Sequence, residues 1–272
     1  MLFPLYDLNP HHRFPLLTLL IIAINMATMG WVSTLNSDRA SSVVFRYGFI
    51  PVRASDIGSG QPVNIPVPQV NRWGQVLPHA QPRIIRLPTD ERSVYLTFLT
   101  TMFLHGGWMH LLFNMWTLWI FGNNIEDRLG HVLYVCFYLL GGMAGTLCHW
   151  AIAPHSTIPV VGASGAIAAV LGGYALTFPT AKIRTLVFVF LIWIVDIPAL
   201  IFLGIWFLLQ VFSGLNLFGG GANQPVAFWA HAGGFVAGLM LMPLLSLGVA
   251  PPGTDWQKEA EELFRFDDPR SP

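Results

Sequence analysis

Long apolar segments separated by short polar ones run through most of the chain. They lie at residues 14–35, 94–122, 131–153, 160–178, 183–212 and 226–247. A helix needs about 20 residues to cross the hydrocarbon core of a bilayer, and segments 14–35, 131–153 and 226–247 are of that length. Each therefore predicts one membrane span. Segment 160–178 is shorter and rich in small residues, which predicts a buried central span.

The segment at 94–122 is too long for one perpendicular crossing. The glycine pair at 106–107 interrupts it. We expect residues 94–105 to lie in the membrane interface, and a span to run from Trp108 to about residue 125.

The segment at 183–212 is divided by Asp196-Ile197-Pro198. A proline that follows an acidic residue is typical of a helix start, so a further span should begin near Pro198. Residues 183–195 are then left as an interfacial segment. The pattern as a whole predicts an all-α polytopic membrane protein with six spans.

Residues 36–93 have a different character, with seven prolines and seven arginines. This composition makes helix improbable and predicts a long external loop, with a short extended stretch at residues 43–52. No chemistry can be assigned to it from the sequence.

Composition supports a membrane protein and excludes several partners. Hydrophobic residues make up 54% of the 272, charged residues 10%, and the net charge is +0. So few charges cannot cover a soluble globule, and the scattered basic residues indicate neither nucleic acid nor an acidic partner. A signal peptide is the alternative for residues 14–35, but that run is long for one and lacks a clear cleavage site.

The two cysteines, Cys136 and Cys148, fall in one predicted helix. They would be about 18 Å apart at 1.5 Å per residue, so they cannot bridge to each other there.

Orientation follows from basic residues in short loops. The turns at residues 122–130 and 179–184 and the C-terminal tail carry them, whereas the loops at 154–162 and 213–225 do not. This predicts that both termini are cytoplasmic. The expected organisation is a cytoplasmic lead at 1–13, a membrane domain at 14–248 and a polar tail at 249–272.

Polar groups inside the predicted spans need an explanation, because ionisable residues are scarce there. His110 and Asn114 are four residues apart and share a helix face. Ser164 begins the fourth span, and His231 lies near the start of the sixth. All of these positions fall near the outer ends of spans two, four and six. Close approach of the helices is favoured by small residues, namely Gly162, Gly165, Ala230, Gly234 and Gly238.

Together these residues could form an acyl-transfer site. Ser164 would be the nucleophile and His231 its general base. His110, Asn114 and the backbone N–H of Ser164 would stabilise a tetrahedral oxyanion. The alternative for each residue taken singly is structural: a satisfied histidine, an interhelical asparagine or a packing serine. Asp196 should lie a bilayer thickness away and is interpreted as a helix cap, which leaves a Ser-His dyad.

These residues resemble the motifs of the rhomboid intramembrane serine proteases. His-Leu-Leu-Phe-Asn at 110–114 resembles the family's H-x-x-x-N motif, and Gly-Ala-Ser-Gly at 162–165 resembles G-x-S-G. Ala-His-Ala-Gly-Gly at 230–234 is similar to A-H-x-x-G. The turn at 124–130, with Glu126 and Arg128, is similar to the family's E-x-R turn. The resemblance covers about residues 14–248, apart from most of 36–93.

The resemblance implies a six-span protease that cleaves transmembrane helices of other membrane proteins near the outer face, without a cofactor or metal. It also implies a cap over the site at 213–225 and a lateral gate in span five, with Trp206 and Phe207. One position departs from the pattern: well-known bacterial members have an aromatic residue one turn after the serine, where this chain has Ala168. What orients His231 is therefore open.

Two other classes compete with an active protease. A rhomboid-like pseudoprotease would bind membrane clients without cleaving them, but such proteins usually lack the serine or the histidine. A transporter would need a charged midplane site, and no acidic residue lies at the predicted midplane. The simplest location is a bacterial plasma membrane. The substrates and the oligomeric state do not follow from the sequence.

Overall fold

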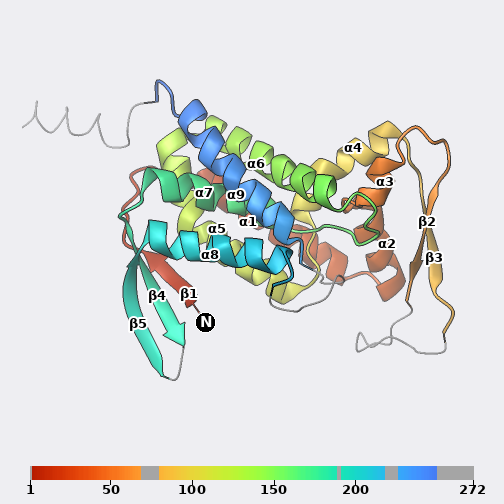
Figure 1. Ribbon diagram of the computed structural model, residues 1–272, viewed down its shortest axis with the longest axis horizontal. Coiled ribbons are helices and arrows are strands. Elements are labelled where there is room, and N and C mark those ends of the chain that lie inside the picture. Colours follow the sequence, from red (N-terminus) through yellow and green to blue (C-terminus); the bar gives the residue numbers. More distant parts are fainter. Residues whose placement is uncertain (1, 69–79, 189–190, 218–225, 250–272) are drawn as a thin grey trace, which may run out of the picture.

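The chain folds into a bundle of helices with a β-sheet at each end (Figure 1). The computed structural model describes residues 2–68, 80–188, 191–217 and 226–249. The bundle contains α1 (Leu16–Ser33), α5 (Trp108–Leu129), α6 (His131–Ile152), α7 (Ser164–Thr177), α8 (Ala199–Gly214) and α9 (Phe228–Leu245). The central helix, α7, contacts α5, α6, α8 and α9 and is buried from Ala166 to Ala175.

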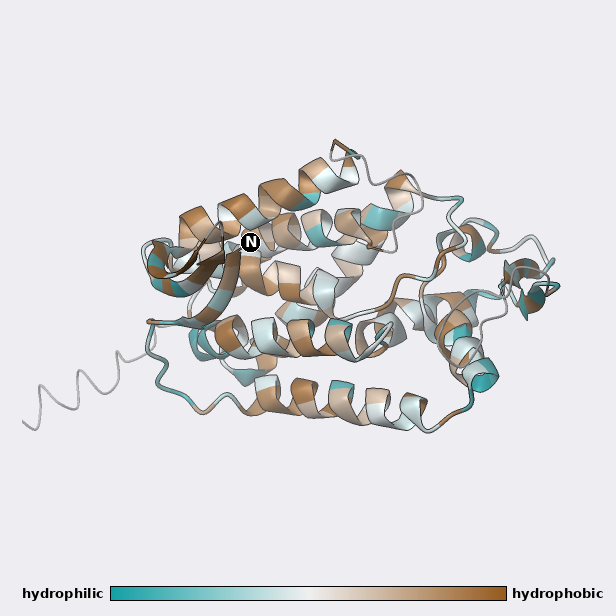
Figure 2. Ribbon diagram, turned by 90° about the horizontal axis from the view of Figure 1, so that it is seen from below, coloured by the Kyte–Doolittle hydropathy of each residue, from teal (hydrophilic) through white to brown (hydrophobic). Residues whose placement is uncertain are grey.

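Each predicted span corresponds to one of these helices, with starts within two residues of those expected. Within the described ranges, three helices are long and apolar enough to cross a membrane: Leu16–Ser33, His131–Ile152 and Phe228–Leu245. Helices α7 and α8 are apolar but shorter. Figure 2 shows hydrophobic residues along most of the bundle helices, and many large hydrophobic side chains are exposed on the surface. The molecule is therefore an integral membrane protein.

Residues 36–68 and 80–93 contain more regular structure than expected. They form α2 (Ser37–Tyr47), α3 (Pro51–Ser55), β2 (Val63–Val67) and β3 (Arg83–Leu87), so the prediction of a loop without helix is wrong. Asn36 caps α2, since its side chain accepts a hydrogen bond from the N–H of Arg39 at 2.9 Å. Pro51 is the first residue of α3, where a proline costs no hydrogen bond. The proline content was a poor guide to the structure, because Pro51 starts a helix and Pro66 lies in a strand of a two-stranded sheet.

The predicted extended stretch at residues 43–52 is also wrong for the most part. It contains the last turn of α2 and the first of α3, and only the link between them is extended. In that link Phe49 forms an isolated antiparallel bridge with Val160.

A buried arginine holds this outer segment together. The Arg53 guanidinium donates to the carbonyls of Pro88 at 2.7 Å and Arg46 at 3.1 Å, and to the Ser93 hydroxyl at 2.7 Å. Burial lowers the pKa of Arg53 below its ordinary value. Arg53 of α3 thereby links α2 to Pro88 and to the first turn of α4 (Glu91–Thr100). Helix α4 and the short 3₁₀ helix η1 (Thr101–Phe103) form the segment predicted at 94–105.

The opposite end of the bundle carries a three-stranded sheet (Figure 1). Strands β1 (Leu2–Asp7), β4 (Lys182–Phe188) and β5 (Ile192–Pro198) are antiparallel in the order β1-β4-β5. The protein is mostly helical, as predicted, but it is not all-α, because the segment expected at the membrane interface contains the paired strands β4 and β5. Runs rich in Ile and Val favour strands when a partner is available. Strand β4 pairs with β5 on one side and, on the other, with β1 from the predicted cytoplasmic lead.

The role predicted for Asp196 as a helix cap is also wrong. It lies in β5, and its carboxylate accepts hydrogen bonds from the Arg184 guanidinium at 2.8 Å and 3.0 Å. Those hydrogen bonds lower the pKa of Asp196. Helix α8 begins after Pro198 without a side-chain cap.

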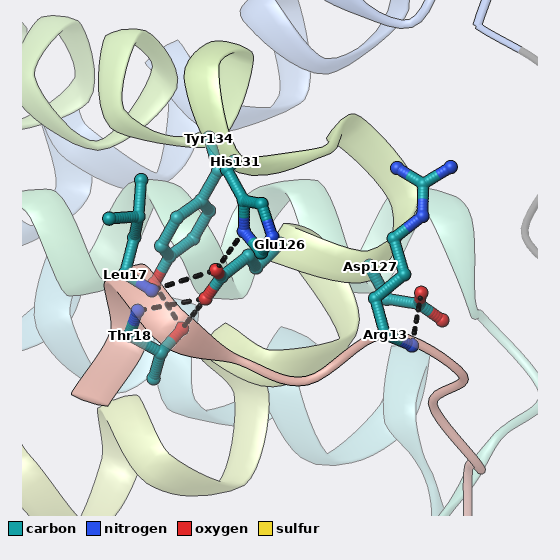
Figure 3. Close-up of polar contacts among 7 residues, drawn as sticks. All are labelled: Arg13, Leu17, Thr18, Glu126, Asp127, His131 and Tyr134. Atoms are coloured by element: carbon teal, nitrogen blue, oxygen red, sulfur yellow. Dashed lines mark hydrogen bonds and ion pairs between the residues drawn. The ribbon is translucent and has the colours of Figure 1, made fainter. Parts of the chain in front are cut away.

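Glu126, near the end of α5, fixes the start of α1 (Figure 3). Its carboxylate accepts from the N–H groups of Leu17 and Thr18, both at 2.8 Å, and from the Thr18 hydroxyl at 2.7 Å. A fourth contact joins it to His131 Nδ1 at 2.6 Å. The carboxylate therefore occupies the N-terminus of α1, where N–H groups have no partner within the helix. Most hydrogen bonds of Glu126 are therefore with α1 and not within the turn that follows α5.

Arg128 lies in the same turn but contacts a different element. Its guanidinium donates to the carbonyl of Val249 at 3.1 Å, just beyond α9. The two residues of the turn thus hold the ends of different helices.

Replacing Glu126 by alanine should destabilise the protein. The change leaves the Leu17 and Thr18 N–H groups without an acceptor, so we expect a loss of about 2–4 kcal/mol in the free energy of unfolding. SDS titration of the detergent-solubilised protein measures this loss. The matched control is Glu91→Ala at an exposed helix start, where about 0.5 kcal/mol is expected. Equal losses for the two variants would contradict the role of Glu126.

Candidate active site

Glycines let α7 approach its two neighbours closely. An added Cβ would lie 2.0 Å from the Ala169 carbonyl oxygen at Gly238 and 2.1 Å from the Gly165 carbonyl oxygen at Gly234. At Gly141 of α6 it would lie 2.2 Å from the Ala169 Cβ. No side chain fits at these positions without moving backbone or a methyl group in contact with it. The face of α9 predicted to carry small residues therefore packs directly on α7.

This packing brings Ser164 and His231 together. Ser164 is the first residue of α7, and His231 lies in the first turn of α9. The distance from Ser164 Oγ to His231 Nε2 is 2.8 Å, a hydrogen bond. The N-cap residue of α7 is Ala163, so Ser164 does not cap the helix and its hydroxyl faces His231. The pair has the separation that proton transfer requires.

His110 lies beside this pair, across Gly162. A Cβ at Gly162 would be 2.9 Å from His110 Nε2 and 3.6 Å from Ser164 Oγ. Gly162 also has φ +123, a backbone conformation that side chains disfavour. Only glycine leaves open the small space between the imidazole and the hydroxyl.

Asn114 lies one turn further along α5 and is buried. Its amide nitrogen donates to the His110 carbonyl at 2.8 Å. An amide nitrogen carries two hydrogens, so one remains for another acceptor. The structure thus brings all four predicted site residues to the same end of the bundle.

The segment before Ser164 is held by the outer part of the chain. Phe49 and Val160 exchange backbone hydrogen bonds of 3.2 Å and 2.8 Å, and the Gly162 N–H donates to the Thr101 carbonyl at 3.0 Å. The Thr101 hydroxyl donates to the Val160 carbonyl. Residues 36–93, for which the sequence indicated no role, therefore help to fix the backbone that presents Ser164.

A cavity opens onto the Ser-His pair. Its volume is about 930 Å³, and its lining includes Ser164, His231 and His110. Its apolar walls include the side chains of Trp108, Val44, Ile158, Phe228 and Trp229. Of the cap predicted at 213–225, residues 213, 214 and 216 line the cavity, and 218–225 lie outside the described residues.

Two residues of α8 contact His231 and were not predicted from the sequence to do so. His231 Nδ1 is 2.8 Å from Gln210 Oε1, and the Trp206 ring lies 6.0 Å from the imidazole with 33° between the planes. The sequence did contain an indication that Gln210 matters, because it is the one amide side chain in the apolar helix Ala199–Gly214. Ala168 is buried against Gly234 on α9, so the aromatic contact of His231 comes from α8 instead.

His105 lies near the site but has a different environment from His231. It is buried, and its ring packs edge-on against the His110 ring at 5.2 Å. This contact supports a structural role for His105. His149 lines the cavity.

Fold and site together define a class: an integral membrane helical bundle that carries a serine–histidine pair in a cavity at one end. The family model described as Rhomboid domain matches residues 92–247, more than half of the chain. The chain therefore belongs to the rhomboid family.

Several curated relatives share parts of the sequence. Rhomboid-like protein 11, chloroplastic, of Arabidopsis thaliana is 30% identical over 55% of this chain and 52% of its own length, so the match spans about half of that relative. RHOMBOID-like protein 5 of the same plant is 25% identical over 95% of this chain and 84% of its own. Rhomboid protease GluP of Bacillus subtilis is 38% identical over 27% of this chain and 14% of its own.

Replacing Gly238 by alanine should disrupt the contact of α7 with α9. The added Cβ meets a backbone oxygen that cannot move independently, so we expect a loss of about 1–3 kcal/mol in the free energy of unfolding. The matched control is Gly204→Ala in α8, where nothing lies within 4 Å of the added Cβ. There alanine should stabilise the helix by up to about 1 kcal/mol. Unfolding curves in detergent that show no loss for Gly238→Ala would contradict the packing role.

Proposed function

We propose that this protein is an intramembrane serine endopeptidase that hydrolyses peptide bonds in or near transmembrane helices of other membrane proteins. The observation that carries the proposal is the 2.8 Å hydrogen bond between Ser164 Oγ and His231 Nε2 inside a cavity at the end of an apolar bundle. Membership of a family that includes named proteases supports it.

Catalysis begins with attack of Ser164 Oγ on the carbonyl carbon of the scissile bond. The hydroxyl proton passes to His231 Nε2, and the imidazolium then gives that proton to the leaving amine. The same imidazole afterwards takes a proton from water as the water oxygen attacks the acyl carbon. The imidazolium then returns the proton to Ser164 Oγ as the new carboxylic acid leaves. The first proton transfer uses a pair of atoms that already lie at hydrogen-bond distance.

The negative oxygen of the tetrahedral intermediate needs donors on the other side of Ser164. The backbone N–H of Ser164 at the start of α7 is one, because first-turn N–H groups lack intrahelical partners. His110 is a second, since its imidazole borders the space over Gly162. The second amide hydrogen of Asn114 is a third.

The substrate class follows from the surroundings of the pair. The 930 Å³ cavity has mainly apolar walls, and the helices around it expose large hydrophobic side chains. A peptide that unwinds from a transmembrane helix matches such a site, whereas a soluble polar substrate does not. Helix α8, with Trp206 and Phe207, is the proposed gate for its entry.

In this proposal α1, α5, α6, α7, α8 and α9 are the six spans of a membrane domain at residues 14–248. Both termini face the cytoplasm, and the Ser-His pair faces the opposite side. The expectation of a bacterial plasma membrane lacks support, because the relatives whose names give a location are chloroplastic or mitochondrial. The tail predicted at 249–272 lies almost wholly outside the described residues.

Ser164→Ala tests the proposed function. The purified protein in detergent should cleave a fluorogenic transmembrane substrate, and the variant should lose that cleavage because the nucleophile is gone. A fluorophosphonate should label the original protein at Ser164 and leave the variant unlabelled. Equal cleavage by both proteins would overturn the mechanism. A protein that binds the substrate but neither cleaves it nor reacts with the probe would be a pseudoprotease.

Gly162→Ala tests the space between His110 and Ser164. The methyl group would overlap the position that the oxyanion and the His110 ring share, so we expect kcat to fall by about 100-fold or more. Gly30→Ala is the control, since nothing lies within 4 Å of a Cβ at that helical position. Unchanged kcat in Gly162→Ala would exclude this space as the oxyanion site.

A further inference from the structure

We infer that Gln210 of α8 is a positioning residue that sets the tautomer and orientation of His231. The inference rests on the proposed function, because it concerns the base of that site. It explains how the imidazole is held in this chain, which has Ala168 at the position where well-known bacterial rhomboids have an aromatic residue.

The first argument is the geometry of the imidazole. Its Nε2 is 2.8 Å from Ser164 Oγ, and its Nδ1 is 2.8 Å from Gln210 Oε1. An amide oxygen can only accept a hydrogen bond, so Nδ1 must carry the proton. In a neutral imidazole Nε2 is then unprotonated, which is the form that can accept the proton of Ser164.

The second argument fixes which end of the amide faces His231. The Gln210 amide nitrogen donates to the Trp206 carbonyl, one turn earlier in α8, at 3.4 Å. If the amide were flipped, two oxygen atoms would face each other there, and neither could donate. The Trp206 carbonyl therefore keeps Oε1 directed at His231.

The third argument is the environment of the glutamine. Helix Ala199–Gly214 contains no charged residue, and its neighbours Leu208 and Leu209 are exposed on the outer face of the bundle. A polar side chain in such a helix is costly unless it finds a partner. Trp206 flanks the same imidazole from the same helix face, four residues away. Helix α8 thus supplies both a hydrogen bond and an aromatic contact to His231.

The test compares Gln210→Met with Gln210→Glu. Methionine is close in size but gives Nδ1 no strong acceptor, so kcat should fall by about 10- to 100-fold with KM little changed. Glutamate keeps an acceptor oxygen, so it should restore most of kcat. Because a carboxylate stabilises the protonated imidazole, Gln210→Glu should also move the acidic limb of the pH profile of kcat to higher pH.

The control variant is Leu208→Met on the outer face of α8, which should match the original protein in kcat and in its pH profile. Unfolding in detergent is measured for every variant, so that a loss of kcat is interpreted only for folded protein. If the original protein cleaves substrate while both Gln210 variants retain its kcat and pH profile, the inference is overturned and the proposed function stands. If the original protein neither cleaves nor reacts with a fluorophosphonate, the proposed function itself fails.

Discussion

The structure depends on the close approach of α7 to its neighbours, which only residues without bulky side chains permit. Gly234 and Gly238 leave no room for a Cβ against the backbone of α7, and Gly141 leaves none against Ala169. In lipid there is no hydrophobic force between helices, so such contacts supply much of the association. The same contacts set the distance between the first turns of α7 and α9, and therefore between Ser164 and His231. The close packing of α7 and α9 and the geometry of the Ser-His pair therefore depend on the same contacts.

The site is also supported from outside the central helices. Phe49 and Thr101 hold the segment before Ser164 by backbone and hydroxyl hydrogen bonds, and Arg53 ties together the outer segment to which Phe49 belongs. On the other side, Gln210 and Trp206 contact the imidazole from α8. A serine and a histidine on two rigid helices are thus oriented by groups that neither helix contains, as a preorganised site requires.

The sequence was most informative where one periodicity or one rare residue type decided the matter. Apolar runs and the breaks within them located all six bundle helices, and the scarcity of polar residues in those runs singled out His110, Ser164 and His231. The same scarcity could have indicated Gln210. Prediction failed for residues 36–93 and 183–195, because proline content and apolar composition do not determine whether a strand finds a partner or a helix finds a cap. Asp196 was misread for that reason: its partner, Arg184, is on the adjacent strand.

By itself the sequence determined which segments are apolar enough to leave water and which few polar side chains they carry with them. That follows from transfer free energy, a property of each residue. Only the tertiary structure decided that Glu126 binds the start of α1, that β1 joins the hairpin of β4 and β5, and that Gln210 faces His231. Each of these is a directional hydrogen-bond arrangement between residues far apart in sequence. No local pattern encodes it, because the partner's position exists only once the helices have packed.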